Sequence, residues 1–205
     1  MSPPRPDSRT RLLDAALQVV RTKGYTATRV EDLCAAAGVT KGSFFHHFAS
    51  KEALAIAAAE HWSAVTGAFF AAAPYHAHPD PLDRVLGYLD FRRVLLAGAP
   101  AEFSCYAGTT IQETFDTWPA LCQAAGRCIT DHAALLARDI EEARRLHAPD
   151  ATWSADSLAL HTQAVLQGAF VLAKVSGGPE PAIDSVDHLR RYIEMLFPQR
   201  FPEAR

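Results

Sequence analysis

Apolar residues recur at helical spacing from the start of the chain. Within residues 8–23 they fall at positions i, i+3, i+4 and i+7, which gathers four side chains on one helix face: Leu13, Ala16, Leu17 and Val20. Ser8 has the side chain of a helix N-cap, and Gly24 suits the end of a helix. The pattern therefore predicts a first amphipathic helix that is capped by Ser8 and ended by Gly24.

Two short helices and the start of a fourth are predicted next. Thr28 and Glu31 have the spacing of a capping box, so they should open a second helix that ends at Gly38. Thr40 should cap a third helix, over the letters KGSFFHHF, and Ser50 should cap a fourth, over KEALAIAAAEHW. Three short helices joined by brief glycine turns are typical of a helix-turn-helix.

The rest of the chain is also predicted to be helical. The fourth helix should run into the seventies, where prolines form a link. Residues 103–118 have the pattern of a short or irregular helix. Longer helices are predicted at four places: Leu82 to Ala97, Pro119 to His147, Ala155 to Ser176, and Ser185 to Phe197. No strand and no internal repeat is predicted, which gives an all-α fold class.

Composition favours a globular chain. Of the 205 residues, 49% are hydrophobic, which is enough to bury a core. No stretch of about 18 consecutive apolar residues occurs, and the polar N-terminus, MSPPRPDSRTR, lacks the apolar region of a signal peptide. We therefore expect a cytoplasmic protein that does not enter a membrane, with its first few residues disordered.

The cysteines and histidines give no sign of a metal site. No CxxC spacing occurs among the four cysteines, so reduced thiols are expected: Cys34, Cys105, Cys122 and Cys128. His46 and His47 are adjacent, and neighbours on a helix point about 100° apart, which disfavours chelation of one ion by both. We expect neither a metal nor a cofactor.

Charge is unevenly distributed along the chain. Residues 1–55 hold 8 Lys and Arg against 5 Asp and Glu, a balance of +3, whereas the rest holds 12 against 18, a balance of −6. A basic N-terminal part on an acidic body suits a protein that turns its first part toward DNA phosphates.

The segment TRVEDLCAAAGVTKGSFFHHFASKEAL, residues 28–54, carries the strongest functional signal. Phe44 and Phe48 are four residues apart and should pack inward against the first two helices. The other sides of the third helix would present hydroxyls, a cation and an imidazole, which suit phosphates and base edges. Gly42 costs up to about 1 kcal/mol relative to alanine inside a helix. Close approach of DNA to the backbone would explain this penalty, and sequence drift is the alternative.

This segment resembles the DNA-binding segment of the TetR family, from the Gly-Val-Thr-Lys-Gly turn to the following S-K-E-A-L. The resemblance implies that Thr28 and Lys51 contact phosphates at two edges of a major groove in which residues 40–46 lie. The family usually has tyrosine at Phe45, so the hydroxyl that commonly reaches a phosphate is missing, and a stacking or apolar role is expected, such as contact with a thymine methyl. The implied DNA-binding residues are Thr28, Thr40, Lys41, Gly42, Ser43, Phe45, His46, His47 and Lys51.

The segment CYAGTTIQETFDTWPAL, residues 105–121, is similar to the effector-domain segment of the NemR-like subgroup of this family. The resemblance implies that Cys105 lies at or near an effector pocket, as an inert buried thiol or as a sensor of electrophiles. Lys174 either contacts Cys105 or an anionic effector, or extends its charge to solvent. The candidate effector-binding residues are Cys105, Tyr106, Trp118 and Lys174. Aromatic residues with polar tips are available for a pocket: Tyr88, Tyr106, Trp118 and Trp62.

The last two helices are too apolar for the surface of a monomer. By resemblance to the family, they would build the four-helix interface of a homodimer, with these contact residues: Leu158, Val165, Gly168, Leu172, Leu189 and Ile193. A two-fold dimer would present two recognition helices to a palindromic operator.

These expectations describe a two-domain repressor: a three-helix helix-turn-helix DNA-binding domain in residues 1–52, and a helical effector-binding and dimerisation domain in residues 53–205. A small-molecule or electrophile effector would bind the second domain and release the first from double-stranded operator DNA. A ligand-dependent activator would use the same parts. An adaptor without DNA affinity and a helical enzyme would also be all-α. The candidate groups of the enzyme would be Asp131, His132, Glu141 and Glu142, and no catalytic motif supports it.

Overall fold

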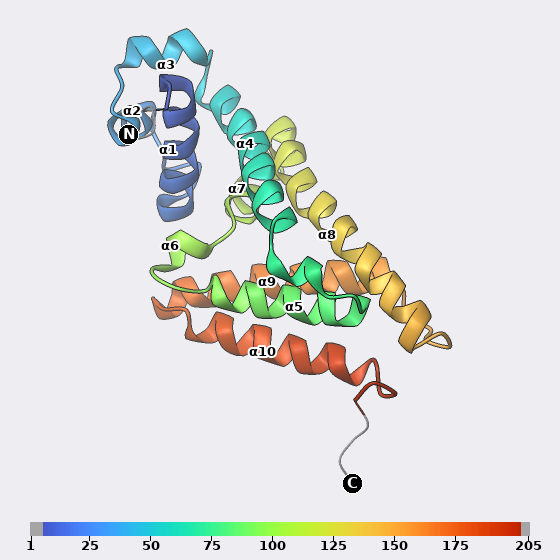
Figure 1. The fold of residues 1–205 in the computed structure, drawn as a ribbon. Coiled ribbons are helices and arrows are strands. Elements are labelled where there is room, and N and C mark those ends of the chain that lie inside the picture. Colours follow the sequence, from blue (N-terminus) through green and yellow to red (C-terminus); the bar gives the residue numbers. More distant parts are fainter. Residues whose placement is uncertain (1–5, 202–205) are drawn as a thin grey trace, which may run out of the picture. The chain divides into compact units, whose positions relative to one another are not determined.

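The computed structural model describes residues 6–201, and the regular elements in that range are all helices (Figure 1). The predicted all-α class is therefore confirmed. Two compact units form, each from two stretches of chain: unit 1 from residues 1–66 and 104–128, unit 2 from residues 67–103 and 129–205. The expected disorder of the first few residues falls outside the described range, and the domain boundary after residue 52 stays a prediction.

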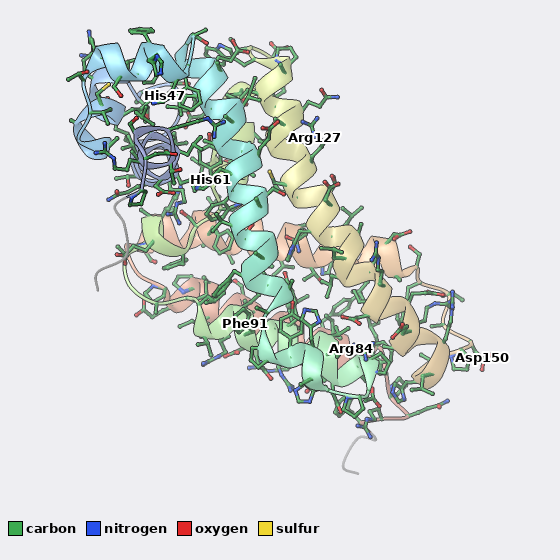
Figure 2. All side chains as sticks on the ribbon, turned by 45° about the horizontal axis from the view of Figure 1, so that its top comes forward. His47, His61, Arg84, Phe91, Arg127 and Asp150 are labelled. Atoms are coloured by element: carbon green, nitrogen blue, oxygen red, sulfur yellow. The ribbon has the colours of Figure 1, made fainter. Side chains whose placement is uncertain are left out.

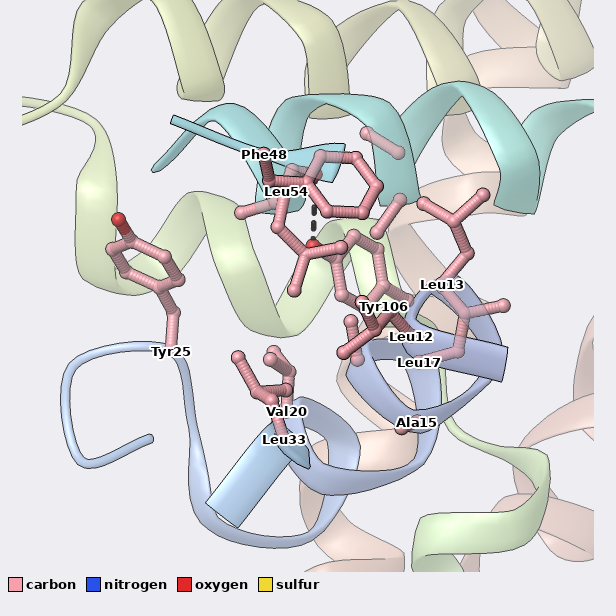
Figure 3. Packing of buried hydrophobic residues seen from close by; sticks show 14 of the residues in the cluster. Leu12, Leu13, Ala15, Leu17, Val20, Tyr25, Leu33, Phe48, Leu54 and Tyr106 are labelled. Carbon is pink, nitrogen blue, oxygen red and sulfur yellow. Dashed lines mark hydrogen bonds between the residues drawn. The ribbon is translucent and has the colours of Figure 1, made fainter. Parts of the chain in front are cut away.

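Unit 1 combines the predicted N-terminal helices with a later segment of the chain. It holds α1 (Ser8–Lys23), α2 (Val30–Ala37), α3 (Lys41–His47), the first part of α4 (Lys51–Ala71), α7 (Tyr106–Thr114) and the start of α8 (Pro119–His147). One hydrophobic cluster joins them. Figure 3 shows Tyr106 of α7 beside Leu12 and Leu17 of α1. The helix-turn-helix therefore shares its core with α7.

The start of α1 differs from the prediction. Asp7, not Ser8, is the N-cap, and its carboxylate accepts a hydrogen bond from the amide of Thr10 at 2.7 Å. Ser8 is already the first helical residue. A carboxylate accepts a stronger, charge-assisted bond from a helix N-terminus than a hydroxyl does, which explains the shift.

The start of α2 also differs from the prediction. The expected pair of Thr28 and Glu31 does not cap it. Instead, the amide of Arg29 donates to the carboxylate of Asp32 at 2.7 Å. Thr28 faces the core with 2% of its surface exposed, and Glu31 pairs with Lys41 of α3. Both residues of the expected box are thus engaged elsewhere.

Unit 2 holds the remaining helices: η1 (Pro74–Ala77), α5 (Pro81–Val94), α6 (Pro100–Phe103), the rest of α8, α9 (Ala155–Ser176) and α10 (Glu180–Met195). α10 packs along α9 and against α5, and α5 also meets η1. The predicted bounds of α8 and α9 are confirmed. α10 begins at Glu180, ahead of the predicted Ser185, because Pro181 in the first turn has a backbone already suited to a helix start.

α9 is a long helix with an apolar sequence. Of the described helices it alone is long and apolar enough to cross a membrane by length and composition, a test that buried helices of soluble proteins also pass. Only 44% of its most apolar window is buried inside the structure. Much of its apolar surface therefore faces outward.

Candidate nucleic-acid interface and effector elements

α3 is fixed to unit 1 by its aromatic residues. The hydroxyl of Thr40 accepts a hydrogen bond from the amide of Ser43 at 3.2 Å, which caps the helix as predicted. Phe44 is fully buried and Phe48 is 5% exposed, so the prediction that both pack inward is confirmed. The turn before α3 contains Gly38 at φ +61°, a left-handed conformation that favours glycine. α3 is therefore held rigidly, with its outer face free of core contacts.

The outer face of α3 is chemically mixed. Thr40, Lys41, Gly42, Phe45 and His46 are exposed, and the Phe45 ring keeps 57% of its surface accessible. That ring lies edge-on to the buried ring of its neighbour, with the centroids 5.1 Å apart. The Lys41 ammonium pairs with the Glu31 carboxylate of α2 and lowers the pKa of that carboxyl. Because this pair is exposed, it is weak and leaves the ammonium available to another anion.

Two other predicted residues of α3 are less exposed. Ser43 and His47 are partly buried, and His47 (Figure 2) has its Nε2 atom 2.7 Å from the Ser8 hydroxyl of α1. The imidazole of His47 therefore ties α3 to α1. Of the two adjacent histidines, His46 is the one whose side chain is exposed.

Gly42 has no structural reason to be glycine. It lies inside α3 without a positive φ. A Cβ added there would meet only the hydroxyl oxygen of Thr40, at 3.7 Å, an ordinary van der Waals distance. Alanine would therefore fit the folded unit, and the cost of glycine in a helix has no compensation within it.

Thr28 and Lys51 hold the loop between α1 and α2. The buried hydroxyl of Thr28 donates to the carbonyl oxygen of Gly24 at 2.5 Å. The ammonium of Lys51 donates to the carbonyl oxygens of Tyr25 and Thr28 at 3.0 and 2.9 Å, and burial lowers its pKa. The sequence did not predict these bonds, because it does not show that loop carbonyls need donors, and the phosphate contacts of both residues stay a prediction. The predicted phosphate contacts would compete with these bonds.

Three of the four candidate effector residues belong to unit 1. Cys105 is the N-cap of α7, and its partly exposed Sγ accepts from the amide of Gly108 at 3.4 Å. Tyr106 is fully buried and donates to the carbonyl oxygen of Ala55 at 3.0 Å, so it packs within the core of unit 1. Trp118 lies edge-on to Tyr25 at 5.2 Å. Both aromatic rings pack against the helix-turn-helix, and the effector pocket around Cys105 stays a prediction.

The fourth candidate, Lys174, lies on the exposed part of α9 in unit 2. Its predicted contact with Cys105 or with an effector stays a prediction.

Sequence reasoning missed two residues that position the helix-turn-helix. Arg11 of α1 donates to the carbonyl oxygens of Ala37 and Gly38 at 2.8 and 3.1 Å, which secures the turn before α3. Glu113 of α7 accepts from the amide of Thr26 at 2.7 Å. No short motif marks either residue, since the partner groups belong to the backbone.

Glu113 also constrains the loop that it contacts. Gly24 has φ +86°, and a Cβ there would lie 2.1 Å from a carboxylate oxygen of Glu113. Position 24 therefore requires glycine for two reasons, the positive φ and the close carboxylate. α7 therefore holds the loop of residues 24–29 through the carboxylate of Glu113.

The predicted dimer residues divide into two groups. Leu158, Leu189 and Ile193 are 5%, 3% and 0% exposed, so they pack inside unit 2 and are corrected as contact residues for a partner. Val165 is partly buried, whereas Gly168 and Leu172 are exposed. Leu172 belongs to an exposed apolar stripe that combines four residues of α9 with two of α10: Leu160, Val171, Leu172, Val175, Tyr192 and Met195. Periodicity found the apolar helices but did not distinguish their two faces.

The candidate enzyme groups of α8 have structural partners. Glu141 pairs with Arg144 and Arg145, which lower the pKa of its carboxyl to about 2. His132 contacts the hydroxyl of Tyr88. Within residues 6–201, no group of three or more His, Cys, Asp and Glu side chains is placed to hold a metal ion.

Two family models match this chain. The model "Bacterial regulatory proteins, tetR family" matches residues 12–58, which contain α2, α3 and most of α1. The model "Tetracyclin repressor-like, C-terminal domain" matches residues 81–189, or 109 of the 205 residues. Together they cover both the candidate nucleic-acid interface and the exposed stripe of α9.

Individual proteins show the same likeness. The HTH-type transcriptional repressor NemR of Escherichia coli is 26% identical over 91% of this chain and 94% of its own, and the crystal structure of its reduced form gives a TM-score of 0.75. The uncharacterized HTH-type transcriptional regulator YerO of Bacillus subtilis is 32% identical over 27% of this chain, a match that spans only 19% of YerO.

A third likeness is to a complex with nucleic acid. A cysteine mutant of the TetR family regulator CifR, complexed with a 26 bp double-strand operator DNA, has a TM-score of 0.75 at 21% identity, over 93% of this chain and 98% of that chain. At this identity the match concerns the fold. With both family models matched in order along the sequence, this chain belongs to the TetR family of DNA-binding transcriptional regulators.

Proposed function

We propose that this protein is a homodimeric cytoplasmic repressor that binds a palindromic operator and leaves it when a small-molecule or electrophile effector acts. The outer face of α3 carries the proposal. Two buried phenylalanines fix this helix, while an ammonium, an imidazole, a hydroxyl and a phenyl ring remain exposed over two turns. Such a face offers cations to phosphates and hydroxyls to base edges.

Phe45 gives this face its particular character. Its ring is 57% exposed and its edge-on contact with Phe44 restricts its orientation. An exposed phenyl ring beside Thr40 and Lys41 suits apolar contact with a thymine methyl in the major groove. Binding of the CifR neighbour to operator DNA supports the same use of the fold.

The exposed stripe of α9 supports the homodimer. Leu160, Val171, Leu172 and Val175 are 52%, 44%, 52% and 81% exposed, so α9 leaves several large apolar side chains uncovered, as a surface that binds a partner does. A second copy of the same stripe would cover it by two-fold symmetry and place two α3 helices on one operator.

α7 gives effector release a physical route. Cys105 caps α7, Tyr106 anchors α7 beneath α1, and Glu113 at its other end holds the amide of Thr26. Alkylation or oxidation of Cys105 would add bulk to the sulfur that accepts from the amide of Gly108 and disturb this bond. The start of α7 would then shift, and with it the loop that positions the helix-turn-helix.

A mobility-shift assay with duplex DNA from upstream of the protein's own gene tests the proposal. Phe45→Ala should weaken operator binding by about 5- to 30-fold, because it deletes a base contact worth roughly 1–2 kcal/mol. Phe69→Ala is the matched control, since Phe69 is also about half exposed, at 48%, but lies in unit 2. Equal losses in both variants, or none in either, would contradict the role of α3.

A further inference from the structure

A cavity of about 270 Å³ lies within unit 2. Its walls come from the end of α4, η1, α5 and α8. Aromatic rings dominate them: the rings of Phe70 and His132 lie edge-on at 4.9 Å, and those of Tyr75 and Tyr88 at 5.8 Å. Leu135 and Leu136 add apolar surface. The shape and lining therefore suit a planar apolar molecule of one or two rings, below the ~300–1,000 Å³ of drug-sized sites.

The packing of η1 against α5 forms part of this cavity. A Cβ at Gly87 of α5 would come within 2.8 Å of the Tyr75 Cβ. Only glycine lets Tyr75 approach α5 so closely, and Tyr75 is then 7% exposed as a wall residue. The close approach of the two elements thus positions an aromatic wall.

One wall of the cavity carries a connected polar cluster. The Tyr88 oxygen accepts from Arg92 Nε at 2.9 Å and from Gln163 Nε2 at 3.3 Å. His132 Nε2 lies 3.0 Å from the Tyr88 hydroxyl and 3.2 Å from Arg92 Nη2, so it accepts from one of these two donors. Burial, followed by the charge of Arg92, lowers the pKa of His132 to about 4, so the ring is neutral at pH 7. With Nε2 accepting, the proton of the ring lies on Nδ1.

The guanidinium of Arg92 gives this wall a positive charge. Within residues 6–201, no ion pair joins the Arg92 guanidinium to a carboxylate. The guanidinium instead lies 4.3 Å from the centre of the Phe70 ring. Asp139, which also lines the cavity, is held by Arg84 of α5 (Figure 2) at 2.7 Å. An uncompensated cation behind an aromatic wall favours an anion.

We propose that this cavity binds a small aromatic anion, with its rings among the side chains of Phe70 and Tyr75 and its anionic oxygens toward Tyr88, His132 and Arg92. The anionic oxygens accept hydrogen bonds at the polar wall, and the charge of Arg92 supplies the preference over a neutral analogue. The role of this ligand as the effector rests on the proposed function. The binding of the ligand to the cavity does not.

Calorimetric titration of the full-length protein with matched probes tests this inference. The probes are 2-naphthoate and its neutral isostere 2-naphthamide. We expect 2-naphthoate to bind about 10- to 100-fold more tightly, since hydrogen bonds to a charged group are the stronger kind. Arg92→Gln should remove this difference. Arg93→Gln is the matched control, because it removes a charge at the next residue, where the guanidinium pairs with Asp187.

Several outcomes overturn the inference. Equal affinities of the two probes for the native protein contradict selection of an anion, and this comparison does not depend on whether any variant folds. A preference that persists in Arg92→Gln contradicts the role of Arg92. Absence of binding for both probes at millimolar concentration contradicts the cavity as a site for aromatic molecules.

The same titrations, paired with mobility shifts, separate this inference from the proposed function. If 2-naphthoate binds through Arg92 but leaves the operator complex intact, the cavity proposal stands and its role in release is wrong. If the protein does not bind operator DNA at all, the proposed function is wrong, and the calorimetric result still decides the inference.

Discussion

Gly42→Ala should make the protein more stable and a weaker DNA binder at once. The new methyl group would meet only the Thr40 hydroxyl oxygen at 3.7 Å, and the residue lies in ordinary helical backbone. Alanine restricts the unfolded chain more than glycine does, so the free energy of unfolding should rise by about 0.5–1 kcal/mol. For a chain of this size that corresponds to a melting temperature roughly 1–4 °C higher.

The DNA-binding effect of the same change has the opposite sign. If the backbone at Gly42 lies against the DNA, a methyl group there displaces α3 from the groove and disturbs its neighbouring contacts. Loss of one good base contact costs roughly 1–3 kcal/mol, or about 5- to 150-fold in affinity. Thermal unfolding without DNA and fluorescence anisotropy with operator DNA measure the two effects separately.

Gly126→Ala supplies the matched control. Gly126 lies within α8, and a Cβ there would meet nothing within 4 Å. The control should therefore gain similar stability with unchanged operator affinity. The explanation of Gly42 by close DNA approach is refuted if Gly42→Ala gains stability and keeps full operator affinity.

The remaining predictions concern the dimer, release and pH. Leu172→Arg should shift the protein to monomers in sedimentation velocity, because it places a charge in the α9 stripe. Val94→Arg, at a 72% exposed position of α5, is the control and should leave the dimer intact. A dimer that persists in Leu172→Arg would contradict the interface. Cys105→Ser should abolish release of operator DNA by N-ethylmaleimide, whereas Cys122→Ser should retain it; release in both variants would exclude Cys105. His132 has a pKa of about 4 in the folded protein against an ordinary 6.5, so the unfolded state binds an extra proton between these pH values. Its contribution to stability, about 3 kcal/mol, is therefore present above pH 6.5 and lost as the pH falls to 4. Urea unfolding of His132→Gln should show a flatter pH dependence in that window, and an identical slope would contradict the assignment.

Sequence predicted most of the fold because apolar periodicity reports directly on helices. α8 and α9 have the bounds that their patterns gave, and Phe44 and Phe48 pack inward as their spacing requires. Periodicity does not report which group will satisfy a loop carbonyl. The bonds of Thr28 and Lys51 to the loop were therefore not predicted.

The sequence did not predict which face of each helix in unit 2 is buried, nor which residues form the polar cluster around Tyr88. An apolar helix such as α9 buries one face in its own unit and exposes another, and only the packing of α10 decides that Ile193 is internal. Tyr88 was noted as an aromatic residue with a polar tip, but His132 and Gln163 reach it from 44 and 75 residues away. Contacts across such distances have no signature in a single sequence.

Operator binding measured against salt decides whether this protein is a sequence-specific, dimeric regulator. Fluorescence anisotropy should compare a duplex from the protein's own upstream region with a scrambled duplex of equal length and composition. We predict saturation at two protomers per upstream duplex, an affinity for it at least about 1,000-fold above that for the scrambled one, and a linear fall of log affinity with log salt. Equal affinity for both duplexes at every salt concentration would contradict recognition of an operator.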